Sequence, residues 1–237
     1  MKKLLAIFLF VIPGLVLAAP SGGPLDRAPV NVSDRDSLKR GATLFVNYCL
    51  SCHSAQYMRY QRIAIDLGIP EDVMAETLIP TGVGPWELMT VAMPAADSEE
   101  WFGKAPPDLS VVTRSLGADW LYTFLRGFYV EEGRPFGVNN TAFKDVGMPH
   151  VMWELEGLKE PIRDGDGNIT GFETVVPGKL SAAEFDQAVG DLVNFMVYLG
   201  EPIVLERKRI GIWVMLFLAF FLVVAYLMKK EYWKDVH

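Results

Sequence analysis

Cysteine, histidine and basic residues are all scarce in this sequence. Its 237 residues include two cysteines and three histidines, and 22 Lys and Arg against 29 Asp and Glu give a formal net charge of -7. Two cysteines cannot form the disulfide framework of a small secreted domain. The acidic balance argues against nucleic-acid binding, which needs a basic face to neutralise phosphates. We also find no internal repeat, P-loop, nucleophile elbow or low-complexity tract in the sequence.

Apolar residues, by contrast, are plentiful enough for one fair-sized core. They make up 51% of the chain and charged residues 22%, a balance that excludes a disordered chain. The charge is unevenly placed along the sequence. Residues 19–205 hold 14 basic and 26 acidic side chains, a formal charge of -12, whereas both ends of the chain are basic.

The N-terminal end has the pattern of a secretory signal. Two lysines precede an apolar stretch from Leu4 to Leu17, and small residues lead up to Ala19. The stretch is short and is broken by Pro13-Gly14. A cleaved signal peptide over 1–18 is therefore favoured over a transmembrane helix.

A second apolar segment, near the C-terminus, is long enough to span a membrane. Ile210 to Met228 is 19 residues without a formal charge. At ~1.5 Å per residue this segment extends about 29 Å, close to the ~30 Å hydrocarbon core of a bilayer. Aromatic residues suited to the two interfaces lie near its ends: Trp213, Tyr226, Tyr232 and Trp233. With its basic flank, the segment predicts a membrane anchor over 206–228.

The orientation of the anchor follows from the export signal, because basic residues are equally numerous on its two sides. We expect the acidic domain over 19–205 to lie in the periplasm and residues 229–237 to form a cytoplasmic tail. The protein would then cross the cell inner membrane once, in contact with membrane lipid.

The strongest local motif is Cys49-Leu50-Ser51-Cys52-His53. The C-x-x-C-H pattern attaches c-type haem, because each thiol forms a thioether with a vinyl group and the histidine binds the iron. A thioredoxin-like redox pair would not require His53. Half of a zinc site would need a second ligand pair, which His150 and His237 do not supply. We therefore expect one covalent haem c.

Helical patterns lie before the motif and near the end of the domain. Ser33 can cap a helix that runs up to Tyr48, and Gly41 inside it would let a second helix cross closely. A capping box at Ser181 opens another apolar pattern that stops at Gly200. Two such helices crossing is the layout expected of cytochrome c folds, so the predicted fold class is mainly α.

The second axial ligand of the iron is the main open question. A methionine thioether or the imidazole of His150 could supply it. Gly147-Met148-Pro149 and Ala92-Met93-Pro94 stand out, because an X-Pro bond fixes an extended backbone that could hold the sulfur rigidly. The mature chain outside the anchor also contains Met58, Met74, Met89, Met152 and Met196.

Four further stretches stand out: the run from Cys52 to Tyr60, Pro106-Pro107-Asp108-Leu109-Ser110 followed by Arg114, Val146-Gly147-Met148-Pro149, and Gly200-Glu201-Pro202 before the anchor. With the haem motif and the anchor, they resemble the cytochrome c1 family, the haem c subunits of the ubiquinol:cytochrome c reductase (cytochrome bc1) complex, of bacterial type. The match covers essentially the whole chain. The loop from Leu67 to Lys104 and the Pro-His after Met148 differ from mitochondrial relatives.

The resemblance implies roles for individual residues. Cys49 and Cys52 would hold the haem covalently. His53 would be the fifth iron ligand and Met148 the sixth, and Arg114 would pair with a haem propionate. The haem would accept an electron from a Rieske iron-sulfur protein and pass it to a soluble c-type cytochrome, beside a cytochrome b subunit in a dimeric complex. As a redox subunit of this reductase, the chain would have no substrate chemistry of its own.

The segment Asp164-Gly165-Asp166-Gly167-Asn168 predicts a hairpin turn rather than a calcium loop. An EF-hand would need glycine and glutamate where Ile169 and Val175 stand. Apolar residues on both sides suit two short strands. We therefore expect a small β-hairpin excursion from the helical domain.

Two other functions are compatible with a c-type haem. A peroxidase would need an open iron site and a distal acid or base, and a ligand sensor would bind carbon monoxide in its reduced native state. We favour an electron carrier, because methionine ligation raises the reduction potential and suits a late position in a respiratory chain.

Overall fold

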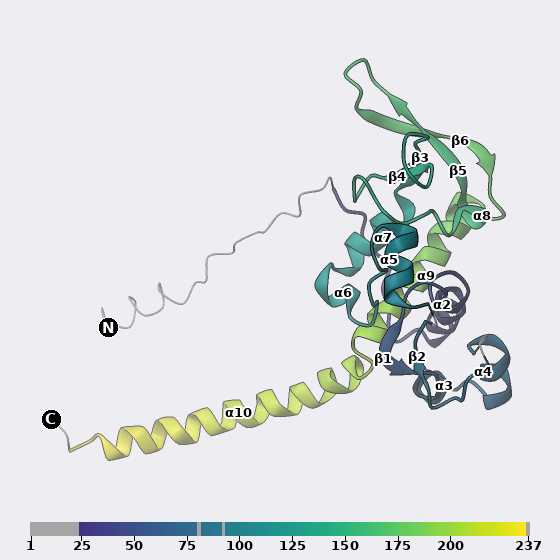
Figure 1. Ribbon diagram of the computed structural model, residues 1–237. Helices are drawn as coiled ribbons and strands as arrows, with labels where there is room; N and C mark the ends of the chain where they lie inside the picture. Colours follow the sequence, from purple (N-terminus) through teal and green to yellow (C-terminus); the bar gives the residue numbers. More distant parts are fainter. Residues whose placement is uncertain (1–23, 80–81, 92, 236–237) are drawn as a thin grey trace.

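The computed structural model describes residues 24–79, 82–91 and 93–235, so the signal peptide predicted over 1–18 lies outside the described residues. Helices dominate the described chain, and the mainly α fold class is confirmed (Figure 1). In chain order the elements are α2 (Arg35–Tyr48), β1 (Ala55–Arg59), α3 (Tyr60–Leu67), α4 (Glu71–Thr77), β2 (Leu88–Met89), α5 (Ala95–Phe102), α6 (Val112–Ser115), α7 (Ala118–Arg126), β3 (Phe128–Val130), β4 (Val138–Asn140), α8 (Trp153–Glu156), β5 (Gly157–Arg163), β6 (Ile169–Pro177), α9 (Ala182–Gly200) and α10 (Val204–Tyr232).

The core centres on the crossing of α2 and α9. Gly41 has no room for a side chain there, because a Cβ atom would lie 2.7 Å from Cβ of Phe195 and closer still to the backbone oxygen of Asp191. The buried rings of Phe45 and Phe195 meet beside this contact with their centroids 5.7 Å apart. The close crossing predicted from Gly41 is confirmed.

The cap of α2 corrects one expectation. Asp34, not Ser33, caps the helix, and its Oδ1 accepts hydrogen bonds from the backbone N–H groups of Asp36 at 3.1 Å and Ser37 at 3.0 Å. Ser33 belongs to the preceding turn, where its own N–H donates to Oδ1 of Asn31. A carboxylate also interacts favourably with the positive end of the helix dipole.

The predicted start and end of α9 agree with the structure. The capping box of Ser181 and Glu184 is present, and α9 ends at Gly200. The stretch over 67–104 was expected only as a loop, yet its described part contains α4, β2 and α5.

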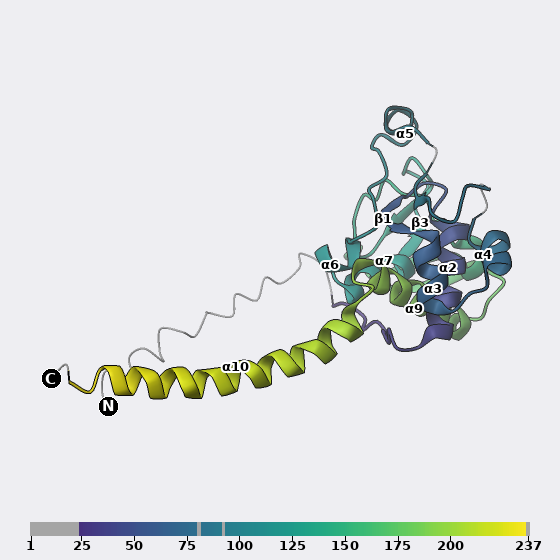
Figure 2. The same cartoon turned by 90° about the horizontal axis from the view of Figure 1, so that it is seen from below.

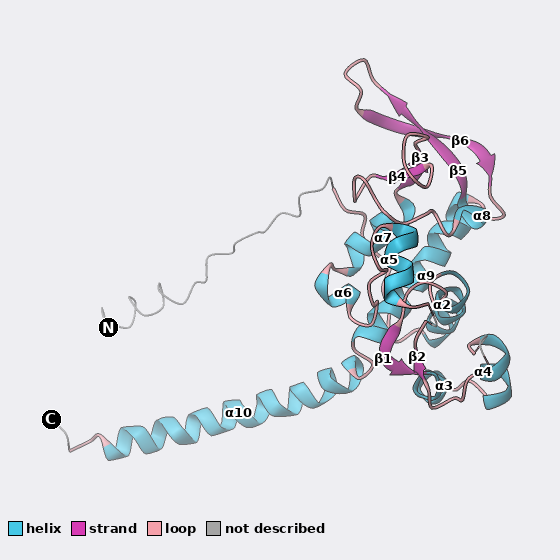
Figure 3. Ribbon diagram, viewed as in Figure 1, coloured by secondary structure: helices cyan, strands magenta, loops and turns pink. Residues whose placement is uncertain are grey.

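The strands form three separate antiparallel pairs, β1 with β2, β3 with β4 and β5 with β6. Figure 3 shows the β5–β6 pair projecting beyond the helices as a hairpin. At its turn, Oδ1 of Asp164 accepts from the N–H groups of Asp166 at 3.0 Å and Asn168 at 2.8 Å. Gly167 takes a φ of 84°, which favours glycine. The predicted hairpin excursion is confirmed.

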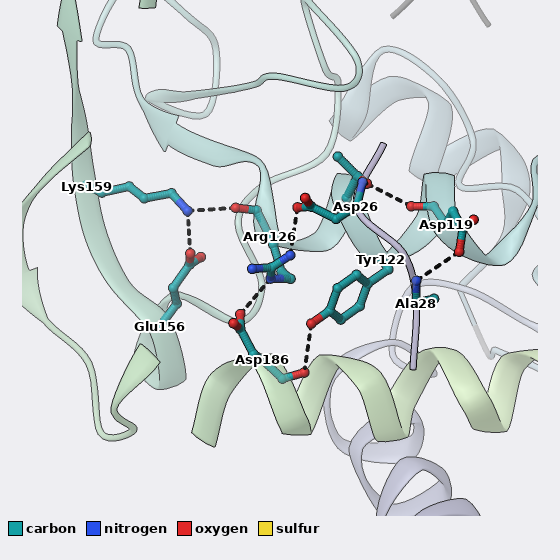
Figure 4. A network of polar contacts seen from close by, with 9 residues as sticks. Asp26, Ala28, Asp119, Tyr122, Arg126, Glu156, Lys159 and Asp186 are labelled. Atoms are coloured by element: carbon teal, nitrogen blue, oxygen red, sulfur yellow. Dashed lines mark hydrogen bonds and ion pairs between the residues drawn. The ribbon is translucent and has the colours of Figure 1, made fainter. Parts of the chain in front are cut away.

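A network of polar contacts ties the base of this hairpin to α7 and α9 (Figure 4). Arg126, the last residue of α7, donates to Asp26 at 2.7 Å and to Asp186 of α9 at 2.6 Å. Lys159 of β5 donates to the backbone oxygen of Arg126 at 2.6 Å and forms an ion pair with Glu156. The charged groups at the hairpin base therefore have partners from several elements.

The C-terminal helix α10 leaves the domain as a separate rod (Figure 1, Figure 2). It has 29 residues, its most apolar 18-residue window has a mean hydropathy of 2.7, and none of that window is buried. At ~1.5 Å per residue the helix is about 43 Å long, so it exceeds the ~30 Å hydrocarbon core. Its basic ends, outside Ile210 to Met228, would therefore lie at the level of the lipid headgroups.

Candidate haem site

The cysteine motif begins where α2 ends. Cys49 is the C-terminal cap, and its backbone oxygen accepts hydrogen bonds from the N–H groups of Cys52 at 3.1 Å and His53 at 2.8 Å. Cys49 is buried and Cys52 is half-buried. Burial raises the pKa of the Cys49 thiol to about 12, with a further contribution from Cys52. One turn of backbone thus gathers the three side chains expected at a haem edge.

The ring of His53 is held in one orientation by a backbone group. Its Nδ1 lies 2.7 Å from the backbone oxygen of Pro107. A carbonyl oxygen only accepts hydrogen bonds, so Nδ1 carries the proton and Nε2 keeps its lone pair. Burial lowers the pKa of His53, partly offset by Pro107 and the charge of Asp108. A neutral imidazole with an available Nε2 is the donor that haem iron requires, so the residues present fit the group.

The segment over 106–110 packs against the motif and supports it. The N–H of Leu109 donates to the backbone oxygen of Ser54 at 2.8 Å. The carboxylate of Asp108 accepts from the N–H of Gln56 at 2.9 Å. In the sequence, this segment is only a mark of the family resemblance. Its supporting role was missed because most of these bonds involve backbone groups, which leave little trace in a sequence.

The methionines separate into two groups by burial. Five of them lie in the apolar core: Met58, Met74, Met89, Met152 and Met196. Met93 and Met148 are only half-buried, and Met148 packs against the edge of the core. The fold itself surrounds a core methionine on all sides. Burial thus separates the two methionines that the X-Pro pattern singled out from the other five.

Met148 lies in a segment that is fixed on both sides. Upstream, Asp145 has a φ of 62°, its N–H donates to Oδ1 of Asn139 at 2.8 Å, and its carboxylate lies 2.8 Å from Arg134. A left-handed backbone at a residue other than glycine persists where its surroundings hold it. Downstream, His150 is buried, with 5% of its side chain exposed. The geometry before and after Met148 is therefore well defined.

Arg114 lies on α6, against the C-terminal end of α9. Its Nη1 is 3.7 Å from Oε2 of Glu201, and 62% of its side chain is exposed. Glu201 also pairs with Arg207 of α10. The hydrogen bond from Arg207, together with the charge of Arg114, lowers the pKa of the Glu201 carboxyl. One carboxylate thus lies beside Arg114, and most of the Arg114 side chain remains exposed.

The structure brings together Cys49, Cys52 and His53. Within residues 24–79, 82–91 and 93–235, no hydrogen bond or ion pair joins Met148 or Arg114 to these three residues. The parts that Met148 and Arg114 play at the haem therefore stay predictions.

Known proteins are similar to this chain along its whole length. The model of the Cytochrome C1 family matches residues 91–236. Cytochrome c1 of Allochromatium vinosum is 48% identical over 100% of this chain and 99% of its own length. The ammonia monooxygenase gamma subunit of Nitrosomonas europaea is 45% identical over 100% of this chain and 99% of its own. A solved chain of a hyperthermophilic respiratory Complex III aligns with a TM-score of 0.43 and 16% identity, covering 99% of this chain and 93% of that chain.

The helical fold, the haem motif and the apolar C-terminal helix define a membrane-anchored c-type cytochrome. The family model covers more than half of the chain, and a relative that is 48% identical covers all of it. The chain belongs to the cytochrome c1 family, the electron-transfer haem subunits of the cytochrome bc1 complex, and it carries one covalently bound haem c. Reductase activity belongs to that complex as a whole. Family membership favours the electron carrier over the peroxidase and the sensor.

Proposed function

We propose that Cys49 and Cys52 hold the haem, that His53 and Met148 ligate its iron, and that electrons pass through this centre. The observation that supports the proposal best is the hydrogen bond from Nδ1 of His53 to Pro107, because it leaves Nε2 free to bind iron. When bound, the haem supplies a one-electron Fe(III)/Fe(II) couple, which a methionine ligand shifts to higher potential.

The polypeptide orients and supports this centre. The Pro107 carbonyl fixes the imidazole plane, and the α2–α9 crossing gives the motif a rigid base. The exposed side chain of Arg114 would pair with a haem propionate, and Glu201 lies 3.7 Å from its Nη1. Each of these groups acts by position and charge, and none is consumed.

The partners follow from the family and from the charge of the chain. We propose a Rieske iron-sulfur protein as electron donor, a soluble c-type cytochrome as acceptor, and a cytochrome b subunit beside the anchor in a dimeric complex. Residues 19–205 carry a formal charge of -12, which would attract a basic acceptor over a distance set by the ionic strength.

The proposed topology places the haem domain outside the cytoplasm. A signal peptide over 1–18 would be removed, residues 19–205 would fold in the periplasm, residues 206–228 would anchor the domain in the inner membrane, and residues 229–237 would face the cytoplasm. Helix α10, which continues through Lys229 and Lys230, supports a single span with basic flanks.

The experiment uses the whole complex purified from membranes. Added ubiquinol should reduce the haem c of this chain, and an added soluble c-type cytochrome should reoxidise it. The variant His53→Ala should lose this reduction, whereas Ser51→Ala, at a position of the motif that binds no haem atom, should keep it. Acidified acetone should leave the haem attached in both variants. A wild-type haem c that ubiquinol cannot reduce would overturn the proposed function.

A further inference from the structure

His150 is buried two residues beyond Met148, and nothing in the proposed electron path uses it. Only 5% of its side chain is exposed. Burying an imidazole costs free energy unless its ring and its nitrogens find partners in the fold. The partners of His150 therefore indicate what the side chain does.

The face of the ring is held by an aromatic series. His150 stacks on Phe128 of β3, with centroids 4.9 Å apart and planes 4° from parallel. Phe128 meets Phe124 of α7 edge-on at 5.3 Å, and Phe124 stacks on Trp120 at 5.0 Å. Aromatic pairs of this kind stabilise beyond the area they bury. The series joins the Met148 segment to α7, one of the helices that packs on α9.

The edge of the ring lies beside a carboxylate. Nε2 of His150 lies 2.9 Å from Oε2 of Glu156, although the two atoms are not aligned as a hydrogen bond. Glu156 is itself paired with Lys159, whose amine donates to the backbone oxygen of Arg126 (Figure 4). Glu156 cannot turn away from His150 without disturbing this pair, so its carboxylate stays beside the imidazole.

We propose that His150 is a positioning residue that fixes the downstream end of the ligand segment and so holds the thioether of Met148 on the iron. The inference rests on the proposed role of Met148 as sixth ligand. Pro149, which joins the two residues, has a restricted φ, so a displacement of His150 is transmitted to Met148. Asp145 fixes the upstream end through Asn139 and Arg134, and His150 is its counterpart.

The consequence concerns how often the iron position opens. An external ligand binds the iron only while Met148 is detached, so its apparent affinity is proportional to the detached fraction. Groups that orient a metal ligand without touching the metal change this fraction and leave the ligand set unchanged. Loss of the His150 contacts should therefore raise the affinity of the iron for external ligands. When no external ligand is added, Met148 should still ligate the iron.

The experiment titrates the full-length haem protein, in detergent, with imidazole in the ferric state. Displacement of Met148 is followed by loss of the near-infrared sulfur-to-iron charge-transfer band. His150→Ala, which removes both contacts, should keep the band before imidazole is added and should bind imidazole about tenfold more tightly. His150→Phe keeps the ring stack but loses the contact with Glu156, so its affinity should rise by less.

The control is Tyr198→Phe, which removes the part-buried 2.7 Å hydrogen bond from Tyr198 of α9 to Asp66 of α3. It should lower stability and leave imidazole affinity unchanged. Wild-type affinity in both His150 variants would overturn the proposal, and if His150→Ala fails to bind haem, His150→Phe alone decides. A wild-type protein without the band, or a band that survives Met148→Leu, would instead overturn the ligand assignment beneath it.

Discussion

Asp191 of α9 receives the guanidinium of Arg40 through two hydrogen bonds, Nε to Oδ2 at 2.6 Å and Nη2 to Oδ1 at 3.0 Å. This fork lies one residue before Gly41, where α2 and α9 come closest. Asp191 thus contacts α2 twice. Its side chain binds Arg40, and its backbone oxygen leaves no room for a side chain at Gly41. The angle and register of the helix crossing are fixed together at this point.

Gly41→Ala should lower the free energy of unfolding of the haem domain by about 3 kcal/mol, because the new Cβ overlaps the backbone of Asp191. Alanine gains only ~1 kcal/mol in intrinsic helix propensity, so the overlap decides the sign. Denaturant unfolding measures the change. Gly165→Ala, at a hairpin position with open space around it, should stay within about 0.5 kcal/mol of wild type. Equal stability of the two variants would contradict the close crossing.

Met148→Leu should abolish the near-infrared sulfur-to-iron band and lower the reduction potential sharply, because leucine cannot ligate iron and a thioether stabilises Fe(II). Spectroscopy of the oxidised protein and a redox titration measure both. Met93→Leu is the matched control, since Met93 is half-buried as Met148 is. A loss of the band in Met93→Leu, with Met148→Leu unaffected, would transfer the ligand assignment to the segment before α5.

Asp108→Ala should destabilise the haem domain by about 1–2 kcal/mol, because two backbone N–H groups lose their acceptor. These groups belong to Gln56 and Ser110, each 2.9 Å from the carboxylate. Amide hydrogen exchange at Gln56 should also become faster, because its N–H loses the Asp108 carboxylate as acceptor. Glu100→Ala, an exposed carboxylate on α5, serves as the control and should change neither quantity. Slow exchange at Gln56 in the variant would show that another group supports the motif.

Ending the chain after Glu201 should yield a soluble domain that holds haem and exchanges electrons. The core residues of α2 and α9 all lie before this point, and α10 buries none of its residues in the domain. The truncation removes Arg207 but keeps Arg114 as a partner of Glu201. Absorbance of the purified domain and its reduction by dithionite test whether the domain is independent of α10. A truncated chain that cannot hold haem would show that the domain depends on its anchor.

Electron transfer to a basic c-type cytochrome should slow as salt rises from low to physiological strength. Residues 19–205 carry a formal charge of -12, and mobile ions screen charges beyond about 8 Å at physiological strength. Stopped-flow rates over a salt series measure the effect, with an acidic acceptor as control. A rate independent of salt would mean that the acidic side chains form no docking patch.

The features that were predicted correctly depend on residues a few positions apart in the chain. The Cys49 to His53 motif closes in one turn, the Ser181 capping box opens α9, and the Asp164 turn closes the hairpin. Ser33 failed as a cap because its neighbour Asp34 is an equally good candidate, and the turn at Asn31 decides between them.

What the sequence could not predict depends on contacts between distant segments. Any residue could offer the carbonyl that Pro107 presents to His53, so its role follows from the fold and not from its side chain. The left-handed Asp145 and the stacking of His150 on Phe128 also join segments that are apart in the chain. The signal peptide and the membrane orientation stay predictions.

The β5–β6 hairpin is fixed at its base, and Arg163 beyond the base adds a 3.5 Å ion pair with Glu131. Lys159 binds the end of α7, and Phe172 packs on Tyr129 at 6.0 Å, so the base belongs to the domain. The backbone hydrogen bonds of residues 162–171 are made within the hairpin itself. Removing facing residues in pairs would keep the alternation of the strands. The length of the β5–β6 hairpin can therefore change without moving the residues of the haem site.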